Sequence, residues 1–216
     1  MKTVTFVRHG QSTANAGGLT MDHAAIPLSA LGEQHAHALA SVLPSQPTAI
    51  ICSEYLRALR TAQPYTDRVG MNIQTHPLLH EFSTIDPALL EGMNGEQRRP
   101  FVEAYWQESD PLKRMGQAAE TFAEFDQRVT SFLPELQRIP DGAVLFGHGM
   151  WIGMLFWKLL GFRACDTMGM KAFRRFQLGL PMPNGAVYHV CESSPGRWHG
   201  HVDEKIMRLM LAVRSS

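Results

Sequence analysis

Short apolar segments alternate with amphipathic ones along this chain of 216 residues. Residues 3–7, 48–52 and 143–146 are rich in β-branched and apolar side chains, and we expect each to form a strand. The segments at 29–42 and 119–136 carry apolar residues at helical spacing. Strands that alternate with helices favour a sheet flanked by helices. The pattern therefore predicts an α/β fold, a three-layer sandwich with a mostly parallel central sheet.

The remaining segments complete this prediction. Ser53 is expected to cap a helix that Pro64 kinks or breaks. Residues 83–117 have weak periodicity and several prolines and glycines, which indicates a small helical insertion with one helix near 96–108. We expect a third strand at 72–76 and a short apolar strand at 78–82. A core helix is expected at 150–160 and a further helix at 164–176. A closing hairpin is expected from 185–192 and 197–202. We expect one domain over residues 1–216.

Composition limits the classes of function. Hydrophobic residues make up 44% of the chain and charged residues 19%, as in a soluble globular protein. The 20 lysines and arginines balance the 20 acidic residues, so no basic field is available for nucleic acid or an anionic membrane. The longest apolar run, 143–162, contains His148 and Lys158, which fits a strand, a turn and a buried helix better than a membrane span.

Cysteine usage indicates a reducing compartment. Cys52, Cys165 and Cys191 lie far apart in the sequence and form no even-numbered disulfide framework. The chain passes directly from its N-terminus into a predicted strand and reaches Arg8, which is not the pattern of a signal peptide. We therefore expect a cytoplasmic protein.

Three of the predicted strands end in polar residues. Arg-His-Gly at 8–10 follows the first strand, Arg57 lies just beyond the second, and His148 follows the strand over 143–146. In an open α/β sheet, ligands bind beyond the carboxyl ends of the strands. We therefore expect these side chains to share one binding edge.

Their chemistry suits phosphoryl transfer. Arg8 and Arg57 can each present a planar fork of donors to phosphate oxygens, and His148 can donate through an imidazole nitrogen. Asn15 and backbone N–H groups of the glycine-bearing loop add neutral donors. These residues are our candidate phosphate ligands.

A nucleophile and an acid complete the set. His9 can attack phosphorus with its lone pair and form a phosphohistidine. Glu81 can protonate the leaving oxygen and later deprotonate water, and burial beside Phe82 would favour its protonated form. Asp86 is a rival for the role of acid.

At these residues the chain resembles the histidine phosphatase (phosphoglycerate mutase-like) superfamily. The motif R-H-G-Q-S-x-x-N over 8–15 looks like the family's opening signature, C-S-x-x-x-R-A-x-x-T-A over 52–62 resembles its second arginine motif, and G-H-G over 147–149 its second histidine motif. The resemblance implies that His9 is the phosphorylated nucleophile and Glu81 the acid and base. It also implies that Arg8, Arg57 and His148 are phosphate ligands, to which we add Asn15 and Gly149 as candidate phosphate-binding residues.

The resemblance leaves the substrate open. Many members carry Gly-x-Trp-Glu-Gly after the acid, whereas Phe-Ser-Thr-Ile-Asp-Pro stands here at 82–87. The chain also looks short for the cofactor-dependent glycolytic mutases, which favours hydrolysis. We therefore expect a phosphomonoesterase that acts on a small phosphorylated metabolite without a cofactor. A phosphoglycerate mutase-type transferase is the alternative, and neither the substrate nor the oligomeric state follows from the sequence.

Two other readings remain. A non-catalytic relative could bind phosphorylated ligands, although the intact nucleophile, acid and arginines argue against it. A metal site is the other: His199 and His201 share a strand face, with His189 as a candidate on the partner strand. His35 and His37 point to different faces of a helix. No cysteine or carboxylate spacing completes a metal site, so we expect none.

Two interpretations of Arg98 and Arg99 remain open. They fall on the one helix expected within the insertion, near 96–108. Their guanidinium groups either bind a substrate anion or belong to a solvated helix face.

Overall fold

The computed structural model describes residues 2–213. Its strands form one six-stranded mixed sheet in the order β3-β2-β4-β1-β5-β6. Neighbours from β3 to β1 are parallel, whereas β5 is antiparallel to both β1 and β6. The strands are β1 (Lys2–Arg8), β2 (Ile50–Cys52), β3 (Gln74–Thr75), β4 (Val144–Gly147), β5 (Val187–Ser194) and β6 (Arg197–Val202). This arrangement confirms the predicted mostly parallel sheet.

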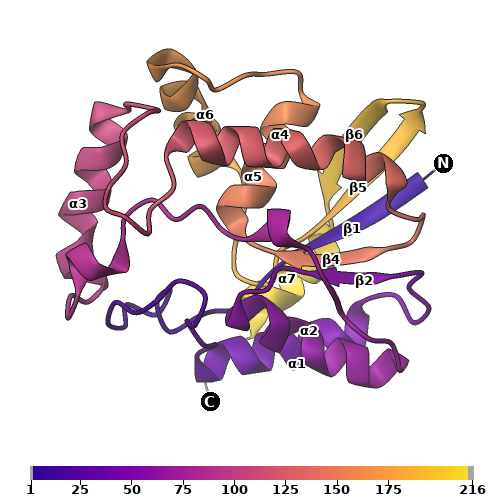
Figure 1. Cartoon of the computed structure of the whole chain (residues 1–216). Coiled ribbons are helices and arrows are strands. Elements are labelled where there is room, and N and C mark those ends of the chain that lie inside the picture. The colour runs from indigo at the N-terminus through magenta and orange to yellow at the C-terminus, as the bar shows by residue number, and fades with distance from the viewer. Residues whose placement is uncertain (1, 214–216) are drawn as a thin grey trace.

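Helices cover both faces of the sheet (Figure 1). One face packs against α1 (Ala30–Val42), α2 (Leu56–Val69) and α7 (Glu204–Ala212). The other packs against α4 (Phe122–Arg138), α5 (Gly149–Leu159) and α6 (Thr167–Gly179). The three-layer sandwich is therefore confirmed, with two apolar cores separated by the sheet.

The alternating side chains of β1 join the two cores. Val4 and Phe6 are buried with the α4–α6 layer, and Val7 is buried with the α1–α2 layer. Val7 and Cys52 both pair with Phe146 of β4, so three neighbouring parallel strands end at the same level. The residues that follow these strands consequently meet at one edge.

The insertion supplies the walls beside that edge. It contains the 3₁₀ helix η2 (Pro87–Leu90) and the helix α3 (Gly95–Glu108), close to the position expected from the sequence. Asn94 caps α3, because its side chain accepts from Gln97 N–H while the Gln97 side chain accepts from Asn94 N–H. Figure 1 shows α3 on the side of the molecule toward which β1 runs from the N-terminus.

Several local predictions are wrong. Pro64 lies inside α2 and does not break it, because Ala62 and Tyr65 bury the apolar face of that helix in the core, and the kink at Pro64 stays a prediction. The residue at the start of α2 is Tyr55, not Ser53, and its side chain makes no capping bond. The short helix α7 was not predicted.

The segment before Glu81 is also different from the prediction. Residues 77–79 form the 3₁₀ helix η1 (Pro77–Leu79) rather than the start of a strand. Proline at its first position fixes φ and removes a backbone donor, which suits a helical turn and not a sheet ladder. The predicted third strand is reduced to two residues, Gln74–Thr75.

Candidate active site

His9 leaves the end of β1 and is only 3% exposed. Its Nδ1 lies 2.6 Å from the Gly10 carbonyl oxygen, and Arg57 Nε donates to its Nε2 over 3.2 Å. A carbonyl only accepts and a guanidinium only donates, so the ring carries its proton on Nδ1 and a lone pair on Nε2. Burial, followed by the charges of Arg57 and Arg8, holds the pKa of His9 well below 6.5. The imidazole is therefore neutral at pH 7.

Arg57 is held against His9 by its own helix and by the loop that contains His23. Its Nη1 donates to the His23 carbonyl over 2.6 Å, and its guanidinium lies 5.0 Å from the centre of the Tyr55 ring. One turn further along α2, the Thr61 hydroxyl donates to the Arg57 carbonyl and accepts from Gly10 N–H at 3.0 Å. These two hydrogen bonds hold Arg57 and the loop after β1 in a fixed relative position.

His148 lies behind His9 and is fully buried. The two ring centres are 5.2 Å apart. His148 Nε2 is 2.8 Å from Ser53 Oγ, which also accepts from Tyr55 N–H, while its Nδ1 has no hydrogen-bond partner among the described residues. Burial first, then the charge of Arg57, holds the pKa of His148 well below 6.5. His148 is thus a second neutral imidazole with an unused nitrogen.

Arg8 has an unused donor as well. One end of its guanidinium donates to the Met182 carbonyl, but its buried Nε has no partner among the described residues. A Cβ on Gly149 would lie 3.0 Å from that Nε, so a glycine there makes room for the guanidinium. Burial lowers the pKa of Arg8, and the charge of Glu81 opposes this effect. Two of the unpartnered buried polar atoms, on Arg8 and His148, therefore belong to the predicted site.

Glu81 binds the start of α5. Its Oε2 accepts from Met150 N–H at 3.1 Å, and its Oε1 accepts from Trp151 N–H at 3.1 Å and from Phe82 N–H at 3.0 Å. The Glu81 side chain is half-buried beside Phe82, and both of its oxygens accept backbone hydrogen bonds. Its charge still acts on Arg8 and Arg57, which places it close to both guanidinium groups.

Asp86 is the weaker candidate for the acid. Its carboxylate accepts from Ala118 N–H and Ala88 N–H, each at 2.9 Å. These bonds, Ala118 first, lower the pKa of Asp86. Asp86 is also absent from the lining of the hollow that contains His9, whereas Glu81 belongs to it.

Asn15 is held by Ser12, at the start of its own loop, and by Asn184, far along the chain. Its Oδ1 accepts from Ser12 N–H at 3.2 Å and from Asn184 Nδ2 at 2.9 Å, which leaves the Nδ2 group as the donor end of the side chain. Asn184 Nδ2 also lies 3.3 Å from the Gly10 carbonyl. The predicted ligand is therefore oriented by a residue from the far end of the chain.

These side chains surround a hollow of about 220 Å³, the inner pocket. Its lining includes Arg8, His9, Ser12, Asn15, His23, Arg57, Glu81 and Arg98. His148 and Gly149 lie behind this surface rather than in it. Arg57 and Arg8 carry two positive charges against the single carboxylate of Glu81, so the pocket favours an anion.

Arg98 reaches this lining with one end of its guanidinium in use. Its Nη1 donates to the carbonyls of Gly18 and Met93, each at 2.8 Å, and so fastens the loop after β1 to the insertion. Arg99 is exposed and does not line the inner pocket. Binding of a substrate anion by Arg98 stays a prediction, whereas the position of Arg99 fits a solvated helix face.

A larger hollow of about 700 Å³, the outer pocket, lies next to the inner one, and His23 lines both. Its other lining residues include Asp22, Tyr55, His80, Ser83, Asp86, Arg114, Glu120 and Glu124. Burial and the charges of Arg57 and Arg128, respectively, lower the pKa values of His23 and His80. Both imidazoles are therefore neutral at pH 7.

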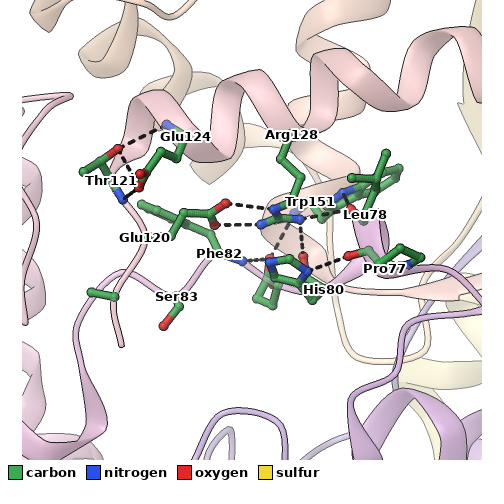
Figure 2. A network of polar contacts seen from close by, with 12 residues as sticks. Pro77, Leu78, His80, Phe82, Ser83, Glu120, Thr121, Glu124, Arg128 and Trp151 are labelled. Carbon is green, nitrogen blue, oxygen red and sulfur yellow. Dashed lines mark hydrogen bonds and ion pairs between the residues drawn. The ribbon is translucent and has the colours of Figure 1, made fainter. Parts of the chain in front are cut away.

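Arg128 fixes one wall of the outer pocket, as Figure 2 shows. It binds Glu120 through two hydrogen bonds of 2.8 and 2.7 Å and donates to the carbonyls of Leu78 and His80. The ion pair is mostly buried, with side-chain exposures of 9% and 15%. Helix α4 therefore holds the segment that carries His80 and Glu81 in a fixed position.

The chain matches the family model described as "Histidine phosphatase superfamily (branch 1)" over residues 4–204. The chain belongs to this superfamily. Among curated relatives, it is 32% identical over 166 residues to a protein named "Probable phosphoglycerate mutase GpmB" from Yersinia enterocolitica. That alignment covers 74% of this chain and 76% of the relative.

Two solved structures that resemble this fold carry the word phosphatase in their names. A putative alpha-ribazole-5′-P phosphatase from Escherichia coli has a TM-score of 0.73 and 22% identity, covering 94% of this chain and 96% of that one. A mycobacterial glucosyl-3-phosphoglycerate phosphatase in complex with VO3 has a TM-score of 0.71 and 22% identity, covering 94% and 98%. These likenesses confirm the fold. Within residues 2–213, no helix has the length and apolar character needed to cross a membrane.

Some of the supporting residues escaped the sequence-based prediction. Ser53 and Thr61 lie within the motif over 52–62, so their positions carried a usable signal. Asn184 directly precedes a glycine before the final hairpin. His23 lies in a loop without periodicity, and nothing in the sequence indicated that it would border both pockets.

Proposed function

We propose that this chain is a phosphomonoester hydrolase that works through a phosphohistidine on His9. The observation that carries the proposal is the state of His9: a neutral imidazole with its Nε2 lone pair directed at Arg57. Such a nitrogen is a nucleophile, and the guanidinium beside it binds the phosphoryl group under attack.

In the first step, His9 Nε2 forms a bond to phosphorus while the bond from phosphorus to the ester oxygen breaks. Arg57 exchanges its contact with Nε2 for contacts with the phosphoryl oxygens. We assign two buried nitrogens without a described partner, Arg8 Nε and His148 Nδ1, as further donors to the same oxygens, with His148 acting from behind the pocket surface. Charge that gathers on those oxygens is stabilised by preorganised donors.

Ser53 pairs with His148 Nε2, and its hydroxyl also accepts from Tyr55 N–H. In the tautomer that we assign, the hydroxyl donates its proton to Nε2, and His148 carries its own proton on Nδ1 and acts as a donor to phosphate. In this role His148 binds the phosphoryl group and does not attack it.

Glu81 is our choice for the acid and base. It lines the inner pocket beside His9, and backbone N–H groups of α5 hold its carboxyl in place. A bound phosphate dianion repels the carboxylate, and a proton on Glu81 removes that repulsion. Glu81 gives this proton to the leaving oxygen. It then takes a proton from the water that attacks the phosphohistidine, which releases phosphate and restores His9.

The charge of the outer pocket favours hydrolysis of esters with uncharged leaving groups over mutase chemistry. Four carboxylates line it, and Arg114 and Arg128 pair with Glu124 and Glu120, which leaves those of Asp22 and Asp86 without an ion pair among the described residues. The neutral imidazoles of His23 and His80 do not offset these charges. A phosphoglycerate brings its own carboxylate, which such a surface repels. We therefore place the leaving group of a small phosphorylated metabolite in this hollow.

The test measures phosphate release from a panel of phosphomonoesters in excess chelator, beside transfer between 2- and 3-phosphoglycerate. We expect hydrolysis that persists in chelator, because Arg8 and Arg57 balance the phosphoryl charge and His148 adds a neutral donor. Turnover that is lost with chelator and restored by a divalent cation would contradict the proposal.

The name of the 32%-identical relative makes the mutase the second candidate. Transfer between phosphoglycerates that is faster than hydrolysis of every other ester would replace our proposal with that one. We also expect a cytoplasmic location, because Cys52, Cys165 and Cys191 are free thiols and the site uses none of them.

A further inference from the structure

A cluster of nitrogen and sulfur ligands lies on the closing hairpin. Cys191 of β5 pairs directly with His199 of β6, and His201 follows two residues later on the same face of the strand. One ligand atom from each of these three side chains lies within 4.8 Å of the other two. Cys191 is buried, whereas both histidines are exposed and free to rotate toward it.

This cluster differs in one member from the group considered from the sequence, in which His189 was the candidate beside His199 and His201. His189 has both ring nitrogens in use: Nδ1 lies 3.1 Å from Thr5 Oγ1, and Nε2 lies 3.2 Å from Asp203 Oδ2. The register of the hairpin brings Cys191 next to the histidines instead. Sequence spacing did not reveal this contact, because cross-strand pairing depends on where the turn falls.

The donor set has the character of a zinc site. Zn²⁺ binds cysteine thiolate and neutral imidazole in tetrahedral geometry, with ligand atoms about 3.5 Å apart at the bond lengths usual for zinc. The three ligand atoms here lie within 4.8 Å, so small rotations of two exposed rings close the difference. The Cys191 thiol has only a weak contact of 3.5 Å with Thr3 Oγ1 to give up.

We propose that Cys191, His199 and His201 bind one Zn²⁺ ion, with water in the fourth position. Binding replaces the thiol proton with the metal and releases that proton to solvent. The ion cross-links β5 to β6, and β6 is the last strand of the sheet. The site therefore clamps the hairpin at an edge that has no further strand beside it.

The zinc site and the inner pocket lie at opposite ends of β1. Cys191 pairs with Thr3 near the start of that strand, whereas His9 follows its last residue. None of the three ligands lines either pocket described above. Zinc bound here consequently stabilises the fold without taking part in the proposed phosphoryl transfer.

Titration of the metal-free full chain with Zn²⁺ and with Co²⁺ tests the inference. We expect one ion per chain, a rise in melting temperature with Zn²⁺, and a thiolate-to-cobalt charge-transfer band with Co²⁺. Cys191→Ser should abolish the band, and His199→Ala and His201→Ala should each weaken Zn²⁺ binding at least about tenfold.

Matched controls use an exposed cysteine and an exposed histidine outside the cluster, Cys165→Ser and His37→Ala. Both should bind metal as the wild type does. The inference is wrong if Cys191→Ser keeps the stoichiometry and the melting-temperature rise, or if the cobalt spectrum lacks a thiolate band. Because His199 and His201 are exposed, their variants keep the test valid even if the cysteine variant fails to fold.

Discussion

The inner and outer pockets adjoin each other but are built in different ways. In the inner pocket, His9 directly follows β1. Behind it, His148 follows β4 and Ser53 follows β2, and these three strands end at one level of the sheet. The outer pocket draws its lining from the loop at 22–23, the insertion and the start of α4. The sheet thus positions the groups that we assign to chemistry, and loops position those that we assign to selectivity.

The charges of the two pockets also differ. In the inner pocket the guanidinium groups of Arg8 and Arg57 lie close to one carboxylate, and two buried nitrogens of the site, on Arg8 and His148, have no partner among the described residues. In the outer pocket two of the four carboxylates are paired, Glu120 with Arg128 (Figure 2) and Glu124 with Arg114. An unpaired buried donor costs stability, so its retention in the inner pocket points to a ligand that satisfies it.

Replacing the nucleophile should have the largest effect. His9→Ala is expected to lower kcat by at least about 10⁴-fold, because no other group offers a lone pair at that position. His37→Ala removes an exposed histidine and should leave kcat unchanged. Steady-state hydrolysis of p-nitrophenyl phosphate measures both, with circular dichroism to check the fold. A His9→Ala enzyme within tenfold of wild type would remove chemistry from the inner pocket.

Replacing the proposed acid, Glu81, tests which of the two pockets supplies the proton to the leaving group. Glu81→Gln should slow hydrolysis of alkyl phosphates by about 10²–10⁴-fold, because an alkoxide leaving group needs a proton. Nitrophenyl phosphates should be affected far less. Asp86→Asn is the matched change in the outer pocket and should not distinguish the two leaving groups. A leaving-group effect that appears with Asp86→Asn instead would transfer the role to the outer pocket.

The pH dependence reports the charge of the inner pocket. His9 attacks only when neutral, and its pKa lies well below 6.5, so the acid limb of kcat/KM that it causes should lie below pH 6.5. Arg57→Gln removes a charge that lowers this pKa, so the limb should move upward toward pH 6.5. Arg60→Gln, an exposed change on the same helix, should leave the profile in place. An unshifted limb in Arg57→Gln would mean that the charge of Arg57 does not control His9.

Neutralising the outer pocket should have the smallest effect. The double variant Asp22→Asn/Glu124→Gln removes two carboxylates and should raise kcat/KM for 3-phosphoglycerate by about fivefold, the size of a partly screened charge interaction. Hydrolysis of p-nitrophenyl phosphate should change less than twofold. Equal changes for the two substrates would mean that the outer pocket does not select against carboxylates.

The same difference between the pockets explains what the sequence could predict. His9, Arg57 and His148 follow recognisable strands within short motifs, so their convergence follows from the parallel order of the strands. The partners of His23 and Arg98 are set by loops whose path depends on contacts between distant residues. The Pro77 turn and the pairing of Cys191 with His199 were missed for a related reason: local pattern does not fix a 3₁₀ turn or a hairpin register.

The most direct test of the account is the location of the phosphoryl group during turnover. The enzyme is mixed with labelled phosphomonoester and quenched at alkaline pH, and the labelled peptide is mapped in the wild type and in His148→Ala. We expect label on His9 in both proteins, with less of it in His148→Ala because a donor to the phosphoryl oxygens is lost. Label on His148, or turnover of the wild type with no labelled histidine under conditions that trap a known phosphohistidine enzyme, would contradict the central claim.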